Sequence, residues 1–217
     1  MKILLVGNGK MGQAFLRRLD DKVVGIITPE KSEIMDIPDI IIDFSNPKML
    51  NKTLFYAHKY QTKLIVGTTG YNNEEMAQLR ELSKEIAIVY SNNFSYGIAF
   101  IESIVEKKLI SRYNAKISET HSSEKSDIPS GTALELATIL NTSCIVSYRE
   151  NDNCGIHKIT LSNPYEEIEI THKAITRDAY VEGVCDLLDW IIKKDKGFYS
   201  FRDYVRVKNS ENIFENE

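Results

Sequence analysis

The sequence KILLVGNGKMG, residues 2–12, decides the fold of this chain. The apolar run over residues 2–6 predicts a buried strand, and the glycines that follow it match the pattern G-x-G-x-x-G. In this pattern the first glycine permits a tight turn, the second lets the backbone approach a pyrophosphate, and the third lets the next helix pack closely on the strand. The N-terminus of that helix faces the phosphates. We therefore predict a dinucleotide site made by Gly7, Asn8, Gly9, Lys10, Met11 and Gly12.

Short apolar runs alternate with helical patterns over the first ninety residues or so. Candidate strands cover residues 2–6, 23–27, 39–43, 63–66 and 86–90, and the helices between them include residues 11–19 and 74–83. Asn73 is the expected N-cap of the second of these helices. Strands separated by helices form β-α-β units, so we predict an α/β fold with a doubly wound parallel sheet.

The regular alternation of predicted strands and helices ends after Tyr90. A helix is expected over residues 98–109 and a strand near 116–119, followed by an irregular loop and a helix from about residue 129 to 140. Strands at 144–148, 157–161 and 167–172 complete a smaller α+β domain. A helical stripe over residues 178–193 follows, and the polar tail after Val207 is expected to fray.

Composition narrows the functional classes. The 217 residues carry a net charge of −4 without a long basic run, so we expect no nucleic-acid partner. No apolar run is long enough to span a membrane and no leader precedes the first strand, so we expect a cytoplasmic protein without membrane contact. Three widely spaced cysteines indicate reduced thiols instead of a disulfide framework or metal site: Cys144, Cys154 and Cys185.

Three further loops follow predicted strands, at the sheet edge where open α/β folds bind ligands. The first is Asp43-Phe44-Ser45. The other two supply the small and amide side chains that can lie against a nicotinamide ring, and we predict cofactor contacts at Gly67, Thr68, Thr69, Ser91, Asn92, Asn93 and Phe94. Each loop taken singly is equally typical of an ordinary turn. Their succession at neighbouring strand ends favours cofactor binding.

The acidic residue that usually contacts the ribose, about 20 residues after the glycines, is missing. The second strand instead leads into Thr28, Pro29, Glu30 and Lys31. Without the acid the 2′-phosphate of NADP is not repelled, and Lys31 could attract it. Alternatively, the Thr28 hydroxyl or backbone contacts suffice for either cofactor. The sequence slightly favours NADP or the use of both cofactors.

Residues 119–134, ETHSSEKSDIPSGTAL, carry the chemistry of the second half. His121 and Lys125 are two proton-transfer groups, and Ser130, Gly131 and Thr132 offer N–H groups and hydroxyls at a helix N-terminus, where anions bind. This set can hold a carboxylate and move a proton beside it. Pro129 and the serine pair predict an irregular loop around His121. The remaining histidines are expected on the surface (His58) or in structural roles on strands (His157, His172).

Other chemistries fit this stretch poorly. No second histidine or cysteine lies at metal-ligand spacing from His121, so no metal is expected. Ser122 and Ser123 lack the partners of a nucleophile triad, so acyl transfer is not expected either.

The chain resembles the 4-hydroxy-tetrahydrodipicolinate reductase (dihydrodipicolinate reductase) family of the lysine and diaminopimelate pathway. The most specific match is E-x-H-x-x-x-K-x-D-x-P-S-G-T-A, which begins at Glu119 and ends at Ala133. Supporting matches lie at residues 7–12, 43–45, 67–70, 91–95, 155–157, 170–174 and 177. The resemblance covers nearly the whole chain.

The resemblance implies a Rossmann-like cofactor domain (residues 1–94 and 177–217) and a smaller substrate-binding and tetramerisation domain (95–176), joined by a hinge. It implies a homotetramer that transfers hydride from NADH or NADPH to C4 of a small cyclic dicarboxylate, whose hydroxyl leaves as water. It assigns acid/base chemistry to His121 and proton donation to Lys125. Gly131 and Thr132 fall where the family holds a substrate carboxylate, and the cofactor contacts carry over to residues 7–12, 67–69 and 91–94.

Ser122 departs from the family, which commonly has a second, substrate-contacting histidine at this position. A hydroxyl can still bond a carboxylate but carries no charge. The connection between Thr28 and the next strand is also short. Two alternatives therefore stay open: a related reductase with a shifted substrate, and a non-catalytic nucleotide sensor. The presence of both His121 and Lys125 argues against the sensor, which needs neither.

Overall fold

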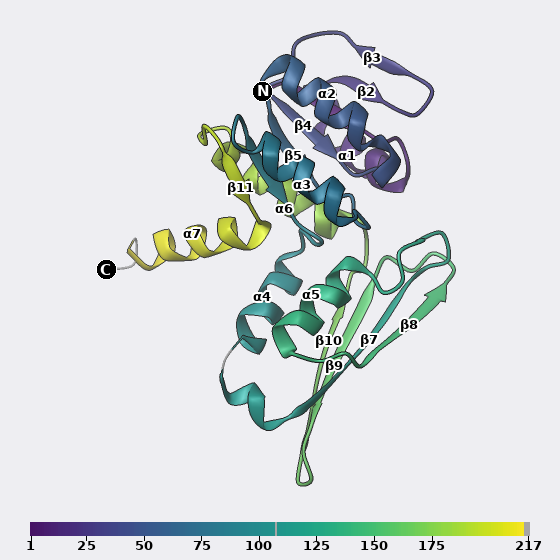
Figure 1. Ribbon diagram of the computed structural model, residues 1–217, viewed down its shortest axis with the longest axis vertical. Helices are drawn as coiled ribbons and strands as arrows, with labels where there is room; N and C mark the ends of the chain where they lie inside the picture. The colour runs from purple at the N-terminus through teal and green to yellow at the C-terminus, as the bar shows by residue number, and fades with distance from the viewer. Residues whose placement is uncertain (107, 215–217) are drawn as a thin grey trace. The chain divides into compact units, whose positions relative to one another are not determined.

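The computed structural model describes residues 1–106 and 108–214 (Figure 1). The chain separates into two compact units, one of Met1–Phe94 with Tyr180–Glu217 and one of Ser95–Ala179. The first unit therefore takes both ends of the chain, and the second unit is a single continuous segment.

The first unit is built on a seven-stranded sheet in the order β11-β6-β5-β4-β1-β2-β3. All neighbouring strands are parallel except β2 and β3, which form an antiparallel edge pair. Its strands are β1 (Ile3–Val6), β2 (Val23–Ile27), β3 (Ser32–Ile34), β4 (Ile40–Asp43), β5 (Lys63–Val66), β6 (Ala87–Tyr90) and β11 (Gly197–Tyr199). Its helices are α1 (Lys10–Leu19), α2 (Leu50–Tyr60), α3 (Asn73–Leu82), α6 (Asp178–Ile191) and α7 (Phe201–Phe214), with 3₁₀ turns at Asp20–Lys22 and Pro47–Met49.

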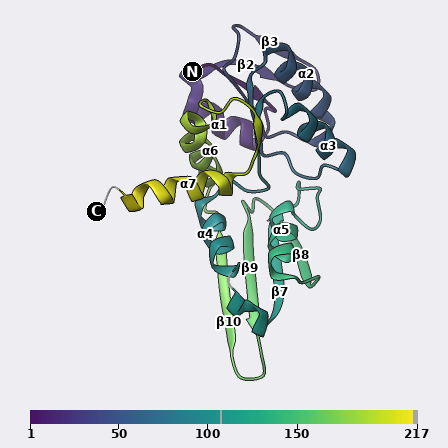
Figure 2. The same cartoon turned by 60° about the vertical axis from the view of Figure 1, so that its left-hand side comes forward.

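Both faces of this sheet are buried. Leu4 and Val6 pack with residues of α2 and α3 on one face. Ile3 and Leu5 point to the opposite face because side chains alternate along a strand, and they are buried as well. Helices α1 and α6 cover that face (Figure 2). The predicted doubly wound α/β fold is therefore confirmed.

The second unit is a four-stranded sheet in the order β10-β9-β7-β8. Its elements are α4 (Tyr96–Val105), β7 (Asn114–Ser122), α5 (Gly131–Leu140), β8 (Ile145–Glu150), β9 (Ile156–Ser162) and β10 (Glu167–Lys173), with a 3₁₀ turn at Lys108–Arg112. Strand β8 is parallel to β7, whereas β9 is antiparallel to both β7 and β10. Ile117 and Ile159 on the sheet pack with Leu136 of α5 in one apolar core. This is the expected smaller α+β domain.

Four local predictions need correction. Strand β7 runs to Ser122, so His121 lies on a strand and not in an irregular loop. The cap of α3 is Asn72, not Asn73, because Asn72 accepts from the Glu75 N–H and the Glu75 carboxylate accepts from Asn72 N–H in return.

The other two corrections concern helix ends. Helix α4 ends at Val105, before the expected residue 109, and residue 107 lies outside the described residues. The tail does not fray after Val207, because α7 continues to Phe214. Tyr204 donates to the Asp186 carbonyl at 3.0 Å and Lys208 pairs with the Asp186 carboxylate at 3.2 Å, so contacts with α6 hold this helix. Residues 215–217 of the predicted first domain lie outside the described part.

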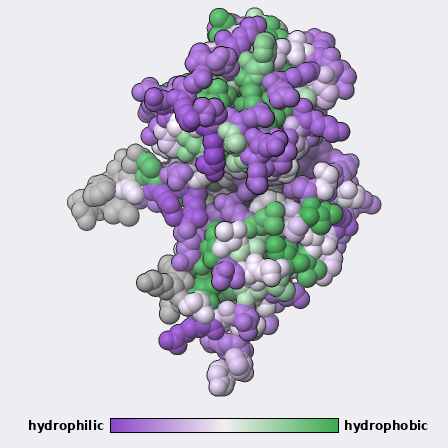
Figure 3. Space-filling model, in the orientation of Figure 1, coloured by the Kyte–Doolittle hydropathy of each residue, from purple (hydrophilic) through white to green (hydrophobic). Residues whose placement is uncertain are grey.

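Apolar side chains gather on the surface of the second unit over α5 (Figure 3). Leu134 is exposed there, and a groove between α5 and β8 has a mixed lining of apolar and polar residues: Pro129, Leu134, Ala137, Thr138, Asn141, Thr142, Ser143 and Ile145. Elsewhere in this unit Tyr148 and Ile168 are exposed. Across the described residues, none of the helices has the length and apolar character that crossing a bilayer requires.

Candidate functional site

The glycines after β1 have the backbone geometry that a dinucleotide needs. Gly7 has φ of +98°, which favours glycine, and a Cβ on Gly12 would lie only 2.3 Å from the Gly7 carbonyl oxygen. A Cβ on Gly9 would meet nothing within 4 Å, so the space above this residue is open. Helix α1 begins without a side-chain cap on its first N–H groups. The loop Gly7–Gly12 therefore fits a pyrophosphate, which would accept from these N–H groups.

Asp43 joins two of the strand-end loops. Its buried carboxylate accepts from the hydroxyls of Ser45 at 2.5 Å, Thr53 at 2.6 Å and Thr68 at 2.7 Å, and from the Ser45 N–H at 3.1 Å. Burial raises the pKa of Asp43, and these hydrogen bonds oppose the rise. Asp43 thus joins the loop after β4 to the loop after β5. The sequence predicts the place of Asp43 at a strand end but does not predict this role.

The other predicted cofactor residues of the first unit lie in the loops after β5 and β6, where several of them hold the loop itself. Gly67 must be glycine because a Cβ would come within 2.2 Å of the Phe44 ring. Thr68 is buried on Asp43, and Thr69 follows it. Ser91 donates to the Asn93 carbonyl at 2.9 Å, and Asn92 accepts from Tyr90 at 3.0 Å. Both residues therefore help to hold the loop after β6.

Phe94 is used for packing. Its ring lies between the rings of Phe44 and Phe201, with centroids 5.4 and 5.5 Å away, and it is buried. A Cβ on Gly183 would lie only 1.9 Å from the Phe94 carbonyl oxygen, so this carbonyl packs directly against α6. The ring and the carbonyl of Phe94 are therefore engaged in packing within the first unit, and the predicted contact of Phe94 with the cofactor stays a prediction.

Two lysines lie at the loop after β2. Lys31 forms an exposed ion pair with Glu33. Lys52 of α2 donates to the carbonyl oxygens of Thr28 at 3.0 Å and Pro29 at 2.6 Å, so a second cation stands at this loop. Lys52 could not be predicted from the sequence, because the contact joins residues more than twenty positions apart.

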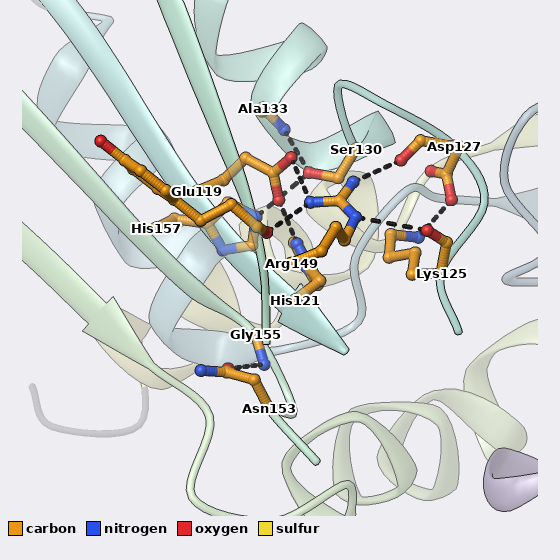
Figure 4. Close-up of polar contacts among 11 residues, drawn as sticks. Glu119, His121, Lys125, Asp127, Ser130, Ala133, Arg149, Asn153, Gly155 and His157 are labelled. Atoms are coloured by element: carbon orange, nitrogen blue, oxygen red, sulfur yellow. Dashed lines mark hydrogen bonds and ion pairs between the residues drawn. The ribbon is translucent and has the colours of Figure 1, made fainter. Parts of the chain in front are cut away.

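In the second unit a buried acid holds His121. Glu119 and His121 are two positions apart on β7, so their side chains point to the same face of the sheet. The Glu119 carboxylate accepts a hydrogen bond from His121 Nδ1 (Figure 4). Burial alone would raise the pKa of Glu119, but hydrogen bonds from His121, Ser147 and Arg149 lower it to about 2. The ionised carboxylate only accepts, so Nδ1 carries the proton and Nε2 is left as the acceptor nitrogen of the ring.

Lys125 lies just beyond the end of this strand. Its ammonium pairs with the Asp127 carboxylate at 2.8 Å, and its backbone N–H donates to the Ser122 carbonyl at 3.0 Å. Ser122 Oγ accepts from the Glu124 N–H at 3.3 Å. Ser122 thus shapes the turn that carries Lys125, and its hydroxyl proton is still available for another acceptor.

The predicted carboxylate site is the N-terminus of α5. Ser130 is its N-cap, accepts from the Ala133 N–H at 3.3 Å and is buried. Gly131 and Thr132 form the first turn, and Thr132 is also buried. Ser130 Oγ lies 3.4 Å from His157 Nε2, so a strand histidine contacts the cap of this helix.

Two other histidines continue a row across the sheet. In register, His172 on β10 stands opposite His157 on β9, which stands opposite Glu119 on β7. The rings of His121 and His157 are 5.0 Å apart, and those of His157 and His172 are 6.4 Å apart. His172 Nε2 lies 3.1 Å from Ser95 Oγ, the N-cap of α4, so each helix cap meets one histidine of the row.

His157 should make stability depend on pH. Burial, together with the charges of His121 and His172, lowers its pKa from 6.5 to about 3. The unfolded chain therefore binds a proton that the folded chain does not, and stability falls as the pH drops from 6.5 towards 3. We expect His157→Gln to flatten this fall without abolishing it, because the pKa of His172 is also lowered by burial.

Urea unfolding followed by circular dichroism at a series of pH values measures this effect. Above pH 6.5 the two proteins should differ by a constant amount, and the loss of stability below it should be smaller in the variant. Parallel curves through the whole window would show that His157 is not the group responsible.

Sequence reasoning missed two members of the hydrogen-bond network around His121. Glu119 belongs to the quoted motif but received no role, and Arg149 was not considered. Arg149 donates to Glu119 at 2.9 Å. The two meet because β8 pairs in parallel with β7, which places Arg149 opposite His121. Only the register of these strands could have revealed the contact.

Comparisons with known proteins agree with this architecture. Residues 1–94 match the family described as dihydrodipicolinate reductase, N-terminus, and residues 97–205 match dihydrodipicolinate reductase, C-terminus. The chain is 38% identical over 213 residues to the 4-hydroxy-tetrahydrodipicolinate reductase of Thermosipho africanus, covering 95% of this chain and 98% of the relative. A Buchnera aphidicola reductase of the same name is 35% identical, over 77% of this chain and 72% of its own.

Solved structures share the fold. A dipicolinate-bound dihydrodipicolinate reductase from Paenisporosarcina aligns with a TM-score of 0.69 at 16% identity, over 94% of this chain and 98% of that one. An amine dehydrogenase from Mycobacterium smegmatis aligns at 0.63 and 10% identity, over 93% and 95%. At such identities the likeness concerns the fold alone. The two domain matches and the Thermosipho relative, however, show that the chain belongs to the dihydrodipicolinate reductase family.

Proposed function

We propose that this protein reduces 4-hydroxy-tetrahydrodipicolinate to tetrahydrodipicolinate, with NADH or NADPH as the reductant and with loss of water. The observation that carries the proposal is the Glu119–His121 pair on β7, with Lys125 just beyond the strand and the N-terminus of α5 in the same unit. A dicarboxylate that is both reduced and dehydrated needs anion contacts and a proton source, and this unit has both.

The first unit takes the cofactor. The loop Gly7–Gly12 fits the pyrophosphate, and the loops held by Asp43 and by Ser91 provide the remaining contacts through residues 67–69 and 91–94, where Phe94 can contribute only its backbone N–H. When bound, the nicotinamide supplies a hydride to C4 of the substrate. Lys52 and Lys31 both stand at the loop after β2, which keeps NADPH open as well as NADH.

The second unit takes the substrate and moves the protons. Ser130, Gly131 and Thr132 hold one carboxylate at the N-terminus of α5, and the Ser122 hydroxyl donates to the substrate from the neighbouring turn. Lys125 donates the proton with which the hydroxyl group leaves as water. His121 exchanges its proton at Nε2 as acid or base while Glu119 keeps Nδ1 protonated. The small cyclic dicarboxylate agrees with the dipicolinate bound by the Paenisporosarcina enzyme.

Oxidation of NADPH and NADH in the presence of the substrate tests the proposal directly. The substrate is made in the cuvette from pyruvate and aspartate semialdehyde. Turnover that requires both this protein and the complete substrate mixture is expected. If the reduced cofactor is consumed no faster than in the mixture without this protein, the chain acts on another substrate or on none.

We propose a homotetramer in the cytoplasm, assembled through the second unit. Support comes from the apolar side chains that gather on this unit over α5, the exposed Leu134 among them (Figure 3), since such a patch on a folded surface is typical of a protein contact. Light scattering on the purified protein distinguishes a tetramer from a dimer or monomer. Leu134→Glu should weaken the assembly if this surface is used.

A further inference from the structure

Arg149 contacts both the acid that bonds His121 and the backbone that carries Lys125. Arg149 Nη1 donates to the Glu119 carboxylate at 2.9 Å, Nη2 donates to the Asp127 carbonyl at 2.6 Å, and Nε donates to the Lys125 carbonyl at 3.2 Å (Figure 4). Its side chain is only 14% exposed. Strand β8 therefore presents a single guanidinium to the acid that orients His121 and to the backbone that carries Lys125.

The chemistry of this arrangement is specific to arginine. A guanidinium has N–H donors pointing in several fixed directions in one plane, whereas an ammonium has three donors around a single point. Three acceptors on two segments of chain, β7 and residues 125–127, can be reached together only by the larger, planar group. The bond to Glu119 is charge-assisted and hence stronger than a neutral one. The two carbonyl bonds fix the backbone on both sides of Ser126.

We infer that Arg149 is a positioning residue for the reaction proposed above: it sets the separation of His121 and Lys125 by holding Glu119 and the segment 125–127 on one rigid group. The inference rests on the proposed function for its effect on turnover. Arg149 acts through Glu119 and through the loop backbone. Without it, Glu119 and the loop lose their common support, and each proton-transfer group moves independently of the other.

The test compares Arg149→Lys with Arg112→Lys, a matched change at an exposed arginine of the same unit. We expect Arg149→Lys to keep its fold and its Kd for NADPH, because the cofactor loops belong to the other unit. Its kcat should fall about tenfold to a hundredfold, since a displacement of about 1 Å at a catalytic group has an effect of this order. The KM should change little. Arg112→Lys should match the wild type in every measurement.

Hydrogen exchange adds a measurement that does not depend on turnover. Amides of the segment 123–130 should exchange faster in Arg149→Lys than in the wild type, and those of β1 and β4 should not change. If the wild type fails to oxidise NADPH or NADH, the proposed function is wrong, yet exchange in this segment still decides whether Arg149 holds the loop.

Two outcomes would overturn the inference. One is wild-type kcat together with wild-type exchange of the segment 123–130 in Arg149→Lys. The other is a loss of kcat matched by an equal loss of folded protein, which would assign Arg149 to stability alone. Methylguanidinium added to Arg149→Ala distinguishes a positioning role from a role in stability alone. A positioning role predicts partial recovery of kcat while the folded fraction stays constant. The absence of any recovery would contradict it.

Discussion

The Lys125→Ala variant is expected to turn over about 10²–10⁴-fold more slowly than the wild type, the range found when a general acid is removed. Lys125 is the cation beyond the end of β7, paired with Asp127 at 2.8 Å, and alanine leaves no proton donor in its place. Steady-state NADPH oxidation gives kcat and KM, and fluorescence titration gives the Kd for NADPH. The Kd should be unchanged, because Lys125 and the cofactor loops belong to different units.

Lys116→Ala is the matched control for this change. Lys116 is an exposed lysine on the same strand, and its loss should leave kcat within about twofold of the wild type, as is usual for surface substitutions. If Lys125→Ala and Lys116→Ala behave alike, Lys125 does not donate the proton, and the water-loss step must draw its proton from elsewhere.

His121→Gln is expected to lower kcat by a similar factor, about 10²–10⁴-fold. Glutamine keeps a polar side chain on β7 and can still donate to Glu119, but it has no group that exchanges a proton near neutral pH. The variant should therefore remain folded while its turnover is lost. The measurement is kcat for the two proteins, with circular dichroism to verify the fold.

His58→Gln provides the comparison, since His58 is an exposed histidine of α2 that pairs with Glu85 at 3.1 Å. Its kcat should coincide with that of the wild type. The double variant of His121 and Lys125 gives the most severe test. Wild-type turnover in that protein would remove both residues from the mechanism.

The features that the sequence predicts best are those in which neighbouring residues determine the outcome. Gly7, Gly9 and Gly12 act within one turn, so their geometry could be predicted from spacing alone. Buried parallel strands such as β4 and β5 have continuous apolar runs and were found within about one residue of their observed ends. The fold class followed from these two local signals.

The features that could not be predicted depend on partners distant in the chain. Pro129 and the serine pair suggested a loop around His121, but pairing with β8 and β9 extends β7 through Ser122. The polar composition of the last segment suggested fraying, whereas contacts with Asp186 hold α7 as a helix. Glu119 and Arg149 are thirty positions apart, and only strand register brings them together.

The contact between Ser95 and His172 shows how the second unit is closed. Ser95 begins this unit and His172 lies close to its end, so the two ends of the inserted segment are held together by their own side chains. A segment whose ends lie close together is the kind of insertion that a host domain tolerates, so changes of length within it need not disturb the seven-stranded sheet.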